Sequence, residues 1–79
     1  MAIFKIDLPY ASYLQGRWAT ARFQIASGYS AILDGERFEL VEMEDENGQE
    51  FVAIFATYDG SGDAIDLVEE KEARALGLI

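Results

Sequence analysis

The sequence predicts an α+β domain: a twisted antiparallel sheet of four to five strands with one C-terminal helix packed on a face. Three observations lead to this prediction. Apolar and polar side chains alternate along several short stretches, Asp34-Gly35 and Asn47-Gly48 are hairpin dipeptides, and the segment from Asp63 to Gly77 carries helix start and stop signals. The 79 residues allow one domain, residues 1–79, and their 51% hydrophobic content favours a packed core over disorder.

The first half of the chain predicts three strands. The first covers residues 3–8, where alternation continues up to a proline, and a loop over residues 9–16 follows. A second strand is predicted over residues 17–26 and a third over residues 29–33. Residues 19–33 also fit a helix followed by a strand, and this alternative stays open.

Two hairpins organise the middle of the chain. Asp34-Gly35 and Asn47-Gly48 both favour the type I′ turn, in which both turn residues have φ > 0. They bound a fourth strand over residues 37–45 and a fifth over residues 49–58. Because the fifth strand is apolar on both faces, we expect it near the centre of the sheet.

The second turn also predicts a register. With two turn residues, the opposed pairs are Glu46 and Gln49, Asp45 and Glu50, Met43 and Val52, and Val41 and Ile54. The core face then carries Val41, Met43, Val52, Ile54 and Ala56. The opposite face carries Glu42 and Glu44 beside Phe51 and Ala53, with Phe38, Leu40 and Phe55 further along.

A helix is predicted from an N-cap at Asp63 to about Leu76. Asp66 near its start and Arg74 near its end complement the helix dipole, and Gly77 occupies the C′ position. The apolar stripe of this helix is thin, so it needs the sheet for stability.

The charge is distributed unevenly. Residues 1–33 have a net charge of +2, residues 34–79 have −11, and the chain has −9. We expect the carboxylates of the second half to gather into one negative surface that binds a partner, although an acidic surface that only maintains solubility is the plainer alternative. The candidate partner-binding residues are Glu42, Glu44, Asp45, Glu46, Glu50, Asp59, Glu69 and Glu70.

The composition argues against an enzyme. The chain has no Cys and no His, so it lacks thiolate ligands, disulfides and the usual general base. Read as a calcium loop, the segment from Asp59 to Glu70 places Ala64 where the turn needs Gly. We therefore predict no catalytic residue, no metal ligand and no cofactor.

The same composition suggests where the protein acts and what it avoids. No apolar run approaches the length of a membrane span, and residues 1–6 do not resemble a signal peptide, so we expect a cytoplasmic location. An acidic surface repels nucleic-acid phosphates and anionic membranes. The expected partner is thus a protein with a basic surface, and the protein itself is expected to be a monomer or a homodimer.

A small, acidic domain without Cys or His resembles the anti-defence proteins of phages and mobile elements, above all anti-CRISPR proteins. The segment Tyr10-Ala11-Ser12-Tyr13-Leu14-Gln15-Gly16-Arg17-Trp18 is also similar to the start of ArdA-type antirestriction proteins, over nine residues and with a shorter spacing. Both resemblances imply an inhibitor that mimics DNA and occupies a basic nucleic-acid-binding surface, for example on a CRISPR effector complex. A small structural, adaptor or oligomerising phage protein with an apolar interface is the alternative.

Overall fold

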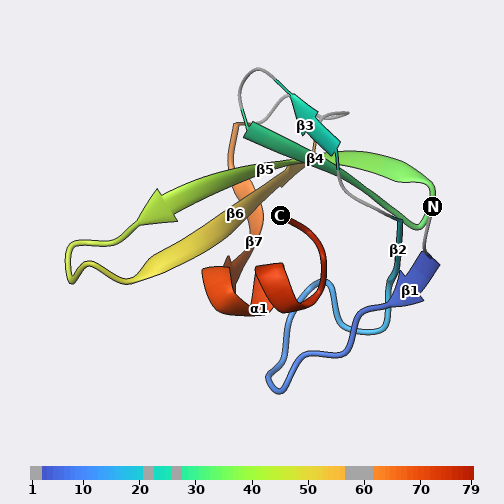
Figure 1. Ribbon diagram of the computed structural model, residues 1–79, viewed down its shortest axis with the longest axis horizontal. Coiled ribbons are helices and arrows are strands. Elements are labelled where there is room, and N and C mark those ends of the chain that lie inside the picture. Colours follow the sequence, from blue (N-terminus) through green and yellow to red (C-terminus); the bar gives the residue numbers. More distant parts are fainter. Residues whose placement is uncertain (1–2, 21–22, 26–27, 57–61) are drawn as a thin grey trace.

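The computed structural model describes residues 3–20, 23–25, 28–56 and 62–79. In these residues, the chain forms seven strands and one short helix, and the molecule has extents of 34 × 29 × 21 Å (Figure 1). The elements in chain order are β1 (Ile3–Lys5), β2 (Trp18–Thr20), β3 (Phe23–Ile25), β4 (Gly28–Leu33), β5 (Glu36–Glu44), β6 (Glu50–Ala56), β7 (Ala64–Glu69) and α1 (Glu70–Ala75).

All pairings in the sheet are antiparallel, and the strand order is β1-β2-β4-β5-β6-β7. β3 pairs with the first half of β4, and β2 reaches the other end of β4 through Ala19 and Leu33. The predicted α+β class with a C-terminal helix is confirmed, but six strands follow one another across the sheet rather than four or five. The described parts of residues 19–33 are strands, so the alternative of a helix there is wrong; Ala21, Arg22, Ala26 and Ser27 lie outside the described residues.

The predicted helix from Asp63 is mostly wrong. Residues Ala64–Glu69 form the edge strand β7, and the helix is only the six residues Glu70–Ala75. β6 is buried and apolar, and without β7 one of its edges would leave backbone groups unpaired inside the fold. The need of β6 for a pairing partner outweighs the local preference of these residues for a helix. That preference was weakly supported, because the predicted helix had only a narrow apolar face.

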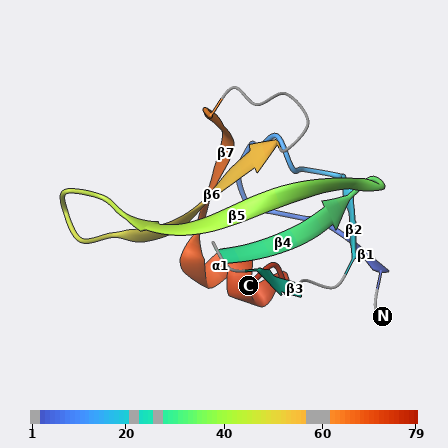
Figure 2. The ribbon, with the colours of Figure 1, turned by 90° about the horizontal axis from the view of Figure 1, so that it is seen from above.

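The end of α1 is as predicted. Gly77 has φ 78°, its N–H donates to the Arg74 carbonyl, and the Leu78 N–H donates to the Ala73 carbonyl. These two bonds form a Schellman motif, and the Ala73 and Leu78 side chains are buried together in the core. The motif turns the chain back toward the sheet, which α1 covers on one side (Figures 1 and 2).

The two hairpin turns differ. Asp34 (φ 52°) and Gly35 (φ 83°) link Leu33 to its partner Glu36, so the predicted two-residue type I′ turn is confirmed. At the second turn only Gly48 has positive φ. The Gly48 N–H donates to the Asp45 carbonyl, and the Asp45 N–H donates to the Gln49 carbonyl, both at 3.0 Å. This turn has one more residue between the strands than predicted.

The extra turn residue shifts the β5–β6 register by one position, so the predicted faces of β5 are wrong. Glu44 opposes Glu50, Glu42 opposes Val52, and Leu40 opposes Ile54. We call the side of the sheet that α1 covers the inner face and the opposite side the outer face. Phe38 and Leu40, predicted to point outward, are fully buried on the inner face with Val52 and Ile54. Val41 and Met43, predicted as core, lie on the outer face with Phe51, Ala53 and Phe55.

The segment after β1 ties the two ends of the sheet together. The Ile6 N–H donates to the Arg17 carbonyl at 2.9 Å, which prolongs the β1–β2 pairing, and Leu14 is buried in the core. On β7, the Asp66 carboxylate accepts from the Ser12 hydroxyl and the Leu14 N–H. Asp66 is thus a structural residue, although not the helix-start residue the sequence predicted.

Candidate protein-binding surface

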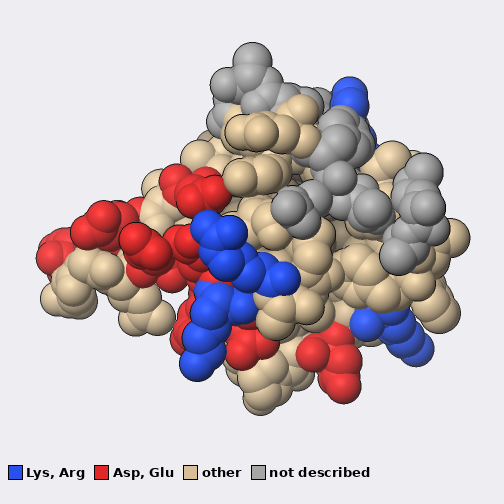
Figure 3. Space-filling model, in the orientation of Figure 1, with Lys and Arg blue, Asp and Glu red and all other residues tan. Residues whose placement is uncertain are grey.

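The β5–β6 hairpin extends away from the rest of the molecule, on the side opposite β1 (Figures 1 and 2). Every residue from Glu42 to Glu50 is exposed, and no Lys or Arg occurs between residues 38 and 70. Carboxylate side chains cover this hairpin in Figure 3, where Lys and Arg side chains lie beside it. We call its five carboxylates the acidic arm: Glu42, Glu44, Asp45, Glu46 and Glu50.

The base of the acidic arm meets the helix at a hollow of about 200 Å³. Glu42 and Glu44 from β5, Glu50 from β6 and Glu70 from α1 line this hollow together with Met43. Three predicted partner-binding residues of the hairpin are therefore joined there by one from the helix. The register shift is what brings them together, because it turns Glu42 and Glu44 toward the side of α1.

The carboxylates around the hollow perturb one another. A hydrogen bond with Glu70, together with its negative charge, raises the pKa of Glu50. The pKa of Glu70 is lowered, first by its hydrogen bond with Arg74, whose Nη2 lies 2.7 Å from Glu70 Oε1. Arg74 thus neutralises the Glu70 carboxylate, and Glu50 is the carboxylate of the group whose ionised form is disfavoured.

This crowding makes a prediction for Glu50→Gln. Because the folded state raises the pKa of Glu50, its ionised form destabilises the fold at neutral pH, and stability recovers as pH falls through the raised pKa. We expect Glu50→Gln to raise Tm at pH 7, and the gain to shrink toward about pH 4, where the wild-type side chain is also largely protonated. Thermal denaturation at both pH values measures this.

Glu46→Gln is the matched control, because Glu46 lies at the hairpin tip and does not line the hollow. It removes the same charge and should change Tm less at pH 7. An equal gain for both variants would show that net charge, and not the Glu50–Glu70 contact, sets the effect.

Asp45 has a structural role that the sequence did not reveal. Its Oδ1 atom accepts from the N–H groups of Asn47 and Gln49, both at 2.9 Å. This is the Asp-mediated turn that competes with regular structure, and it fixes the hairpin tip between Glu44 and Glu50. The outward-facing negative charge of the arm therefore comes mainly from the four glutamates.

The remaining predicted residues do not join this group in the same way. Glu69 opposes Phe51 and so occupies the outer face, away from the hollow. Asp59 lies outside the described residues. In the described part of the chain, no group of three or more Asp or Glu residues is arranged to hold a metal ion.

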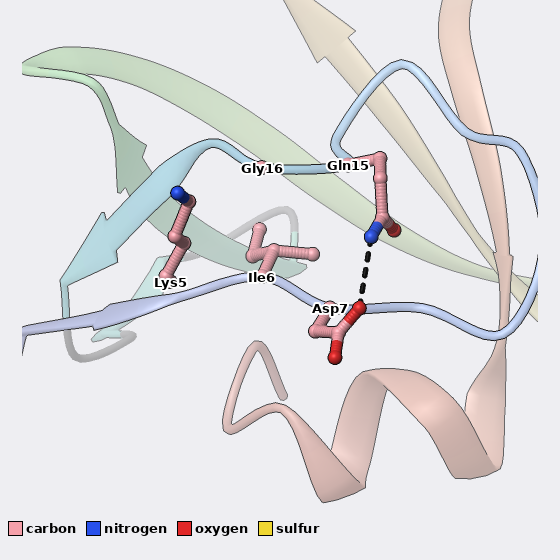
Figure 4. Close-up of a pocket in the computed structure, with 5 residues that line it drawn as sticks. All are labelled: Lys5, Ile6, Asp7, Gln15 and Gly16. Atoms are coloured by element: carbon pink, nitrogen blue, oxygen red, sulfur yellow. Dashed lines mark hydrogen bonds between the residues drawn. The ribbon is translucent and has the colours of Figure 1, made fainter.

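A second hollow lies at the opposite end of the molecule, lined by Lys5, Ile6, Asp7, Gln15 and Gly16 (Figure 4). Gln15 points across it and donates to the Asp7 carboxylate at 2.9 Å, while its carbonyl accepts from the Leu8 N–H. These contacts close the loop, so the polar groups of this hollow mainly bind one another.

Three aromatic side chains of the first half of the chain are exposed: Trp18 (53%), Tyr13 (54%) and Tyr10 (36%). Lys5 lies over the Trp18 ring and Arg17 over the Tyr13 ring, at 5.8 and 5.0 Å from the ring centroids. The Trp18 and Tyr13 rings therefore already cover cationic side chains of the same chain, which gives them an internal packing role, whereas Tyr10 hydrogen-bonds to the backbone of Glu69.

Sequence reasoning missed two participants in the candidate surface. Arg74 forms an ion pair with Glu70, which lines the hollow, and the i,i+4 spacing of these two residues was the available signal. Met43 lines the hollow and faces outward, which the predicted register hid.

Comparisons of the chain with protein-family models, with curated protein sequences and with solved structures found no match. Among the described residues, no helix has the length and apolar character required to cross a membrane.

Proposed function

We propose that this protein is a non-enzymatic inhibitor whose acidic arm occupies a basic nucleic-acid-binding surface, such as that of a CRISPR effector complex, and blocks access of DNA. The observation that carries the proposal is the concentration of five exposed carboxylates on one extended hairpin. A hairpin of this kind reaches into a groove that a flat acidic surface would only cover.

The charge density of the arm fits such a groove. Glu42 to Glu46 span roughly 13 Å along β5 and the turn, at about 3.3 Å per residue. Duplex DNA carries one charge per about 1.7 Å, or about eight charges over the same length. The four glutamates of the arm, whose charges the turn does not engage, supply about half of this density, enough to compete for Lys and Arg side chains placed to hold phosphates.

The contacts are expected to be electrostatic in character. Exposed ion pairs contribute only about 0.2–1 kcal/mol each, so several must act together. Such a surface accelerates association and loses affinity as salt rises, because the charges are screened within about 10 Å at 0.1 M ionic strength.

The test measures inhibition of DNA binding. Purified CRISPR effector complexes are mixed with a fluorescent target duplex and increasing amounts of the protein, and DNA binding is followed by anisotropy. We expect the wild type to displace DNA, and a variant with Glu42→Lys, Glu44→Lys and Glu46→Lys to need at least about tenfold more protein. Asp45 is left intact because its carboxylate holds the turn.

The matched control carries Asp63→Lys and Glu72→Lys, which reverse charges outside the arm and its hollow. It should inhibit like the wild type. Full DNA binding by every effector tested at saturating protein would contradict the proposal, and so would equal inhibition by the arm variant after circular dichroism has shown it to be folded.

A further inference from the structure

The outer face of the sheet carries an apolar patch next to the acidic arm. Three strands contribute to it in register: Val41, Ala53 and Leu67 form one row, and Met43 and Phe51 begin the next. Phe55 lies one row further along β6. We call the side chains Val41, Met43, Phe51, Ala53, Phe55 and Leu67 the outer patch.

The outer patch is accessible at its margins. Leu67 is 55% exposed and Met43 is 44% exposed, and Val41, Phe51 and Phe55 are half-buried. The helix does not cover them, because it packs on the inner face with Val52 and Val68. A contiguous apolar group on a solvent-facing sheet is typical of an interaction surface.

Carboxylates border the outer patch. Glu69 stands beside Phe51 in the same row, and Glu39 stands beside Phe55. Beyond Met43, the same strand runs directly into the acidic arm. The cation nearest in this strand, Arg37, lies at its far end, two positions beyond Glu39. The patch is therefore apolar at its centre and carries Glu69 at the margin toward the arm, whereas Glu39 lies at the opposite margin, on the same face as Arg37.

We propose that the outer patch binds a basic amphipathic segment of the partner protein, with apolar side chains on the patch and Lys or Arg side chains reaching Glu69 and the tip of the acidic arm. This proposal deepens the proposed function, since it assigns one partner two adjoining contacts. Charge complementarity selects this occupant: a second copy, with net charge −9, would place its own Glu39 and Glu69 against the same carboxylates.

The test uses two peptide probes of equal length and charge. One is a helical Leu/Lys peptide with Leu on one face, and the other has every Leu replaced by Gln. Calorimetric titration of the wild type should show tighter binding of the Leu/Lys peptide, and binding that persists when salt abolishes binding of the Gln/Lys peptide.

A double variant, Val41→Gln with Leu67→Gln, removes apolar surface from one row of the patch without changing charge. We expect it to bind the Leu/Lys peptide about tenfold more weakly and the Gln/Lys peptide unchanged. Ile3→Gln is the control, since Ile3 is 69% exposed but lies on β1, at the other end of the strand order. Equal affinity of the double variant and the wild type for the Leu/Lys peptide would overturn the proposal.

Sedimentation equilibrium tests whether a second copy of this protein, instead of a basic segment, occupies the outer patch. A wild type that dimerises at micromolar concentration, with a double variant that stays monomeric, would assign the patch to a second copy and overturn the proposal. The outcome is independent of the arm: charge reversal at Glu42, Glu44 and Glu46 tests the proposed function, whereas the Gln substitutions test only the patch.

Discussion

Replacing Phe38 with Ala is expected to unfold most of the protein near physiological temperature. Phe38 is fully buried at the centre of the inner face and is among the largest buried side chains. The Arg17 guanidinium stacks on its ring at 5.0 Å from the centroid. Truncation of a buried Phe costs about 3–5 kcal/mol, and a core of this size rarely supplies more than about 3–5 kcal/mol in total.

Urea denaturation followed by far-UV circular dichroism measures the loss. Phe55→Ala is the matched control: it removes the same side chain from the outer face, where Phe55 is half-buried, and should cost clearly less. If the two variants were destabilised equally, the inner and outer faces assigned here would be wrong.

Gly28→Ala is expected to have the second-largest effect, about 2–5 kcal/mol. Gly28 begins β4 with φ 149°, and a Cβ there would lie 2.7 Å from the backbone carbonyl oxygen of Leu40. A residue with a side chain pays about 1–2 kcal/mol for such a backbone conformation, and moving a strand backbone aside adds about 1–3 kcal/mol. The clash is with the backbone of β5, so it would disturb the pairing of β4 and β5 at the centre of the sheet.

Gly16→Ala separates these two contributions. Gly16 also has positive φ (79°), but no other atom lies within 4 Å of the position its Cβ would take. It should therefore show the conformational cost alone. Thermal denaturation in which both variants lose the same stability would show that the close approach to Leu40 contributes nothing.

The sequence predicts the fold class and four strand positions because these depend on local alternation and turn chemistry. The Asp34-Gly35 hairpin, with both residues at positive φ, is the clearest success. At Asn47-Gly48 the same dipeptide rule fails, because the Asp45 side chain accepts from two turn N–H groups and stabilises a longer turn. One additional residue was enough to exchange the two faces of β5.

The helix prediction failed for a non-local reason. Residues 64–69 suit either a helix start or a strand, and the choice is made by β6, which needs a partner on its second edge. Nothing near Asp63 in the sequence signals that need. Gly77, whose role depends only on its own φ and two local hydrogen bonds, was predicted correctly.

The sequence predicted which carboxylates form the candidate surface, but it did not predict how they are arranged in space. The concentration of carboxylates in the second half is visible in the sequence, and Glu42, Glu44, Glu50 and Glu70 do line one hollow. Which of them face the helix depends on a register that no local rule supplies, whereas the i,i+4 spacing that pairs Arg74 with Glu70 was visible in the sequence. The outer patch was missed because it depends on the same register.

The Asp45 contacts have a thermodynamic consequence for recognition. A loop that is free in solution must be ordered when a partner arrives, and the lost backbone entropy, about 1–2 kcal/mol for each residue, weakens the complex. Here the tip is already tied by its own carboxylate before any encounter. Asp45→Ala is therefore expected to weaken binding by the proposed acidic arm in two ways, by removing one charge and by letting the tip fluctuate.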